Sequence, residues 1–290
     1  MTNPAVFWPG TLGILFLVAG IIAYRRDFQT SSGDAAFGLT AFGPVFVAGA
    51  LAAFAGEHFT IAPTLAQMVP KWMPGRLFIA YFVGVAHLAA ALSFVTRRYV
   101  RWSSPCLALM FALFVLLMDF PAALAHPATR LPWILTAREG TFAIGALALF
   151  ATTTRASAPA RAALLATIAR YWTACVLVFY GVLNALYPHV APGVPSPVPA
   201  PAWVPLSALI AYATGLLLIA FGIAMFVQKY AGAAAARCGL LMALLTAAIY
   251  APQWAIARDA SQQIVGINFV FDTLLFAGTV LVIGRAIGES

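Results

Sequence analysis

The chain has 290 residues, of which 63% are hydrophobic and only 8% are charged. A soluble domain usually carries about 25% charged residues, so this composition excludes an ordinary soluble fold. The formal net charge is +8, which in a soluble protein would suggest a nucleic-acid partner. Here the basic residues fall mainly in short segments between apolar runs, as is typical of signals that orient a membrane protein. We therefore predict a protein whose partner is the lipid bilayer and not nucleic acid.

Nine apolar runs of membrane-spanning length follow one another along the chain, and we expect each to form an α-helix. The predicted helices cover residues 4–24, 35–59, 76–96, 102–125, 132–154, 163–187, 206–228, 233–257 and 262–287. A short polar loop is expected at 27–34, and longer loops at 60–75 and 188–205. The last is rich in proline, which favours an extended backbone. The predicted fold class is an all-α, polytopic transmembrane bundle.

An internal repeat appears when the chain is shifted by 131 residues. The matched pairs are Trp72 with Trp203, Pro74 with Pro205, Tyr81 with Tyr212, Gly84 with Gly215, Tyr99 with Tyr230 and Pro121 with Pro252. The repeated unit holds four helices, so both copies run in the same direction across the membrane. We predict a leading helix and loop at 1–34, a first four-helix repeat at 35–154, a linker at 155–162 and a second repeat at 163–290.

Basic residues divide unevenly between the two predicted sides of the membrane. The C-terminal side carries eleven of them: Arg25, Arg26, Arg97, Arg98, Arg101, Arg155, Arg161, Arg170, Lys229, Arg237 and Arg285. The opposite side carries four: Lys71, Arg76, Arg130 and Arg258. Cytoplasmic loops are enriched in Lys and Arg. We therefore predict a multi-pass inner-membrane protein with a periplasmic N-terminus and a cytoplasmic C-terminus.

Ionisable side chains inside the predicted helices are the candidate functional residues, because charge within a bilayer is costly and commonly functional. They belong to the outer half of the first repeat, where we expect a polar pocket, and the charged groups of the fourth and fifth predicted helices lie at similar depth. Its candidate residues are Asp119, Arg138, Glu139, Glu57, His58 and His87. The second repeat keeps milder polar candidates at Tyr250, Asn268 and Asp272.

Two interpretations of these charges stay open at this stage. Arg138 and Asp119 can form an ion pair that only ties neighbouring helices together. The same residues can instead line a functional pocket for a head group, a quinone or a proton. No catalytic residue can be assigned from the sequence. Histidines at ligand spacing on one helix are absent, so we predict no metal site.

One stretch of the first repeat carries a family resemblance. Gly56, His58-Phe59, Val69-Pro70, Trp72 and Pro74 are followed by a glycine-bearing helix that ends in Arg97-Arg98. This pattern resembles the DoxX-like membrane proteins, which are four-helix units with a proline-rich outer loop. The resemblance covers residues 35–154 well and 163–287 weakly. The chain thus resembles two fused DoxX-like units preceded by one helix.

The resemblance implies a role beside membrane redox systems, since relatives include thiosulfate:quinone oxidoreductase subunits, methylamine-utilisation proteins and oxidative-stress complexes. It implies an accessory or quinone-linked subunit, with quinone as the candidate cofactor and redox subunits as partners. Two other functions remain open: a binding or transport protein for a small hydrophobic molecule or lipid, and a structural partner of another membrane protein.

Overall fold

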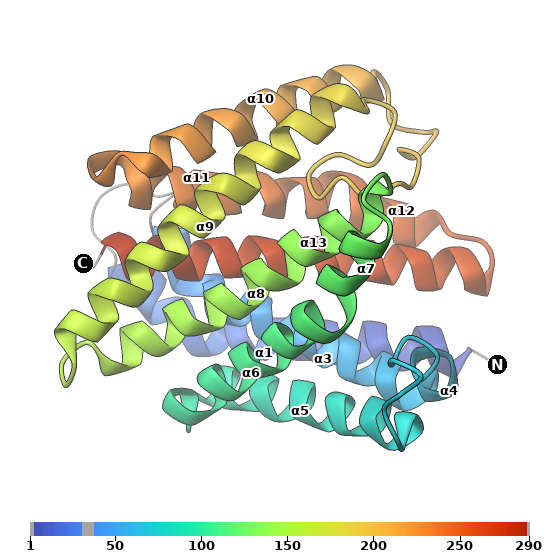
Figure 1. Cartoon of the computed structure of the whole chain (residues 1–290), viewed down its shortest axis with the longest axis horizontal. Helices are drawn as coiled ribbons and strands as arrows, with labels where there is room; N and C mark the ends of the chain where they lie inside the picture. Colours follow the sequence, from blue (N-terminus) through green and yellow to red (C-terminus); the bar gives the residue numbers. More distant parts are fainter. Residues whose placement is uncertain (1–2, 31–37, 289–290) are drawn as a thin grey trace.

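The computed structural model describes residues 3–30 and 38–288. Within these ranges, nine helical segments are long and apolar enough to cross a membrane. The prediction of an all-α, polytopic bundle is therefore confirmed (Figure 1). These nine helices indicate a multi-pass membrane protein. A helix suits the bilayer because it pairs its own backbone groups, for which lipid offers no partner.

Several of the spans are interrupted or extended by short helical pieces. In chain order the elements are α1 (Pro4–Thr30), η1 (Leu39–Phe42), α3 (Gly43–Thr60), α4 (Ala62–Leu65), α5 (Arg76–Thr96), α6 (Val100–Phe114), η2 (Val115–Asp119), α7 (Phe120–Ala125), α8 (Arg130–Thr154), α9 (Pro159–Leu186), α10 (Ser207–Phe226), α11 (Gln228–Leu245), η3 (Thr246–Tyr250), α12 (Ala251–Ile256) and α13 (Ala260–Gly288). The third predicted helix, at 76–96, agrees with α5 at both ends.

The predicted polar loop at 27–34 is wrong at its start, because α1 stays helical to Thr30. A contact distant in sequence holds this extension in place. Arg97 forms a 3.1 Å ion pair with Asp27, donates a hydrogen bond to the Ala23 carbonyl, and stacks over the Tyr24 ring. Residues 31–34 of that loop lie outside the described residues. The predicted linker at 155–162 is also shorter, because α9 begins at Pro159, and proline suits the first turn of a helix.

The two halves of the chain interleave in the bundle. Helix α13 of the second half packs against both α3 and α8 of the first half, and α8 also packs against α9. Helices α13 and α8 therefore form the centre, with α5 and α6 on one side and α10 on the other (Figure 1). Side chains from both halves consequently meet in one core. Superposition of the two predicted repeats stays a prediction.

A pair of π-helical turns occurs at matching positions of the two predicted repeats. Segment η2 spans Val115–Asp119 and η3 spans Thr246–Tyr250, so the two turns lie 131 residues apart. Each is followed closely by a proline, Pro121 or Pro252. Proline lacks the N–H that would bond to the preceding turn and clashes with that turn, which disrupts the regular α-helix. Wide turns of this kind occur often at functional sites.

Candidate functional site

A cavity of about 380 Å³ is lined mainly by the first half, with three residues from α13, at the end of the bundle where α3 connects to α5. Helices α5 and α6 form its walls, and side chains of α8 and α13 form its polar end. The last residue of α4 and the segment 66–73 after it also line the cavity, through Leu65, Met68, Val69, Pro70 and Met73. Most of the remaining lining is apolar: Phe54, Ile79, Ala80, Phe82, Val83, Met110, Phe111, Leu113, Phe114, Leu117, Met118, Leu135, Phe142 and Leu275.

An ion cluster joins the two halves at the polar end of this cavity. Arg138 donates hydrogen bonds from Nε and Nη2 to Glu139 Oε1, at 3.2 and 2.9 Å. Its Nη1 donates to Asp272 Oδ2 of α13 at 2.5 Å. The three side chains are only 13–24% exposed, and all three line the cavity. Arg138 is thus a cation held between two carboxylates from different halves of the chain.

Asp119 stands apart from this cluster. It ends the π-turn η2 and lines the cavity, but no ion pair joins it to Arg138 among the described residues. Its Oδ2 atom is buried and has no hydrogen-bond partner there. A buried acceptor without a partner is energetically unfavourable. Asp119 is therefore free to bind a group that enters the cavity, and the sequence-based pairing of Asp119 with Arg138 is replaced by Arg138 with Asp272.

Two histidines face the cavity beside these acids. His58 has Nδ1 2.8 Å from the Phe54 carbonyl, so in a neutral ring the proton lies on Nδ1 and Nε2 is an acceptor. His87 is buried, and neither of its ring nitrogens has a hydrogen-bond partner among the described residues. The two ring centroids are 5.2 Å apart. This close approach depends on Gly84, because a methyl group there would lie 2.7 Å from Cβ of His58.

The structure brings most of the predicted candidates together and leaves two outside. Asp119, Arg138, Glu139, His58 and His87 all line the cavity, and Asn268 and Asp272 of the second half join them. Glu57 is buried with an unpartnered Oε1 but is not part of the lining. Tyr250 is also outside the lining, and its hydroxyl donates a hydrogen bond to the Pro192 carbonyl.

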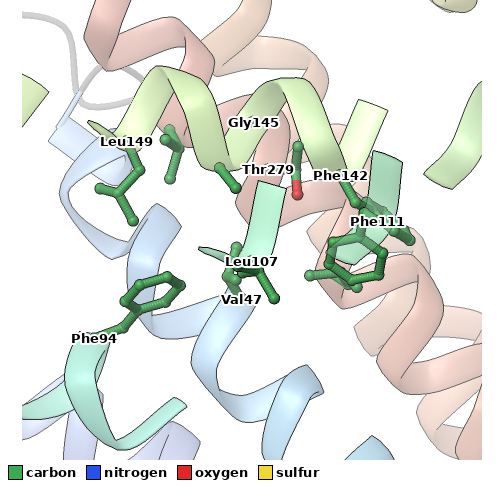
Figure 2. A pocket seen from close by; sticks show the side chains of 11 residues that line it. Val47, Phe94, Leu107, Phe111, Phe142, Gly145, Leu149 and Thr279 are labelled. Carbon is green, nitrogen blue, oxygen red and sulfur yellow. The ribbon is translucent and has the colours of Figure 1, made fainter. Parts of the chain in front are cut away.

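An aromatic pair closes the inner end of the cavity. The rings of Phe111 and Phe142 meet edge to face with centroids 5.4 Å apart. Both rings also line a separate void of about 10 Å³. Figure 2 shows this void, with Phe111 and Phe142 at one end and Phe94 and Leu149 at the other. The void has about the volume that one water molecule needs, so the space on the far side of this aromatic pair is too small for a lipophilic molecule.

The apolar part of the site was not predicted from the sequence. Residues such as Met68, Met73 and Phe111 are indistinguishable by composition from the many other apolar residues of the chain. The available signal was the common depth of the charged residues, and it located the polar end. Comparisons with protein-family models, curated proteins and solved structures find no significant match for the chain.

Proposed function

We propose that the first-half cavity binds a lipophilic molecule that has a polar head group. The observation that carries this proposal is the division of one 380 Å³ cavity into long apolar walls and a single charged end. Small-molecule sites are commonly mostly apolar, with a few polar groups that orient the ligand. The apolar body would lie between α5 and α6, and the head would lie near Asp119, Arg138 and His58.

Quinones are the class of ligand that we propose first, in line with the DoxX-like pattern. A quinone carries two electrons and two protons when it is reduced to a quinol. The residues fit such a head: His58 offers an unprotonated Nε2, Asp119 an unpartnered carboxylate oxygen, and His87 a ring without a fixed partner. These groups can hold and exchange protons beside the head. In this proposal the chain is an accessory subunit, and redox partner subunits supply or accept the electrons.

Retention of a ligand, without transfer across the membrane, is the second element of the proposal. The Phe111–Phe142 pair separates the cavity from the small void beyond it. A transport protein would need to open this partition. The structure thus offers more support for a binding or accessory role than for transport of a small hydrophobic molecule or lipid.

A cavity-filling substitution tests ligand binding. Val83 lines the cavity and is 6% exposed, whereas Val85 on the same helix is 56% exposed on its outer face. We expect native mass spectrometry of the protein, extracted gently from its membrane, to show a bound lipophile in the parent and in Val85→Trp. We expect Val83→Trp to lose it, because the indole would occupy the cavity. Equal retention of the lipophile by both variants would contradict the proposal.

We also propose that the protein lies in a bacterial inner membrane with its N-terminus in the periplasm. The basis is the eleven-to-four distribution of basic residues, together with the positive-inside rule. We expect a C-terminal fusion to a protein that fluoresces only in the cytoplasm to be fluorescent. We expect a C-terminal fusion to alkaline phosphatase, which is active only in the periplasm, to be inactive. An active phosphatase beside a dark reporter would show the reverse orientation.

A further inference from the structure

The second half contains a buried chain segment within the loop that joins two of its helices. Residues 191–195 have the sequence Ala-Pro-Gly-Val-Pro and belong to the loop between α9 and α10, yet all five are buried. A methyl group added to Gly193 would lie 3.2 Å from Leu245 and 3.4 Å from Met242. The segment thus lies directly against helix α11. We call residues 191–195 the internal plug.

The predicted repeat relates the internal plug to the ligand cavity. Under the 131-residue shift, Met242 corresponds to Phe111 and Leu245 to Phe114. Phe111 and Phe114 both line the cavity of the first half. The two residues that contact Gly193 are therefore the counterparts of cavity-lining residues. If the two repeats superpose as predicted, the second half fills with its own chain the space that the first half leaves open.

Two side chains form hydrogen bonds with the backbone groups of the internal plug. Tyr250 donates its hydroxyl hydrogen to the Pro192 carbonyl. Asn184 donates to the Gly193 carbonyl at 3.0 Å and accepts from the Gly193 N–H at 3.1 Å. Tyr250 is the counterpart of Asp119 under the same shift. In the second half this position therefore contributes a hydrogen-bond donor, and its partner is an acceptor.

In the first half, the matching position carries a hydrogen-bond acceptor where the second half carries a donor. An ionised Asp119 can only accept hydrogen bonds, and its Oδ2 is the buried oxygen that has no partner among the described residues. His58 adds a second acceptor at Nε2, because its Nδ1 is engaged with the Phe54 carbonyl. Arg138 donates from Nε, Nη1 and Nη2 to Glu139 or Asp272, and none of these hydrogen bonds reaches Asp119.

We infer that the cavity selects a lipophilic ligand whose head group donates hydrogen bonds, through a hydroxyl or an ammonium group, to Asp119 and His58. The inference rests on the proposed function and specifies it further. In quinone terms, the site prefers the hydroxyl-bearing quinol to the carbonyl-bearing quinone. A carbonyl head can accept from the remaining N–H groups of Arg138, but it cannot donate to Asp119. It would therefore leave the Oδ2 atom of Asp119 buried without a partner, which a binding site disfavours strongly.

The test compares four probes that share a ten-carbon chain. A decyl quinol and its decyl quinone differ in donors at the head, and decylamine and decanol distinguish an ammonium donor from a hydroxyl donor. Dissociation constants are measured by titration of the purified protein in nanodiscs, with the quinol kept reduced. We expect the quinol to bind about tenfold more tightly than the quinone, the ratio that one charge-assisted hydrogen bond supports.

Variants at the central position separate this inference from a general effect of charge. Asp119→Asn restores a donor and should remove most of the preference for the quinol. Asp119→Tyr reproduces the second half and should favour the quinone. Asp259→Asn removes an exposed acid outside the cavity and should leave the tenfold ratio unchanged.

Each outcome has a defined meaning. A quinone that binds the parent as tightly as the quinol overturns the inference while leaving the proposed function in place. The same holds if Asp119→Asn keeps the full preference with a thermal stability equal to the parent's. If none of the four probes binds the parent, the proposed function fails, and the inference fails with it. Tighter binding of decylamine than of decanol would identify ammonium as the preferred donor, and the reverse would identify hydroxyl.

Discussion

Substitution of Arg138 by methionine is expected to destabilise the protein by about 3 kcal/mol, at the lower end of the range for loss of one partner from a buried ion pair. The lower end applies because Arg138 and its partners face a cavity and keep 13–24% of their side-chain surface exposed. The substitution leaves Glu139 and Asp272 close together without a counter-charge. The measurement is thermal or denaturant unfolding in a fixed detergent.

A compensating variant distinguishes lost charge balance from lost packing. Arg138→Met combined with Glu139→Gln and Asp272→Asn removes the uncompensated charges while keeping the side-chain volumes, so we expect most of the lost stability to return. Arg161→Met serves as a control at an exposed position of α9, outside the cavity lining. If Arg138→Met alone were as stable as the parent, the ion cluster would not hold the two halves together as we describe.

Substitution of Gly278 by alanine is expected to have the second large effect, a loss of about 1–3 kcal/mol from overpacking. Gly278 lies where α13 crosses α3. A methyl group there would lie 2.8 Å from the Gly43 carbonyl oxygen and equally close to the backbone nitrogen of Val47. Backbone atoms cannot rotate away as a side chain can, so the two helices must separate. Small residues at membrane helix crossings commonly permit such close approach.

Gly232→Ala provides a matched control for this prediction. A methyl group at Gly232 would have its nearest neighbour at 3.4 Å, which is an ordinary van der Waals distance. We expect Gly232→Ala to unfold within about 0.5 kcal/mol of the parent. Equal stability of Gly278→Ala and Gly232→Ala would contradict the close crossing of α3 and α13, and with it the interleaved arrangement of the two halves.

Hydropathy alone predicted the fold class well, because lipid permits few structures other than helices across a membrane. Helix ends were predicted less well wherever a distant contact decides them. Helix α1 extends to Thr30 beside the ion pair of Asp27 with Arg97, and nothing in the sequence near Asp27 shows that pairing. Proline at residue 159 did mark the true start of α9, although we had placed the helix start later.

The polar end of the site was predictable for a physical reason, and its pairing was not. Arg138, Glu139 and Asp119 share one depth in adjacent predicted helices, and charges in a bilayer gather to avoid lipid. The partner of Arg138 from the second half, Asp272, depends on α13 packing beside α8. Helix neighbours across a repeat boundary are not encoded in spacing along the chain, so this pair appears only in three dimensions.

The most direct test of our central claim is an experimental structure of the protein extracted with its native lipids. We expect elongated density inside the cavity between α5 and α6, with its polar end within hydrogen-bond distance of Asp119 and with the internal plug in place in the second half. A first-half cavity that is closed by its own side chains, or that contains only isolated water-sized density, would contradict the claim that this cavity is a ligand site.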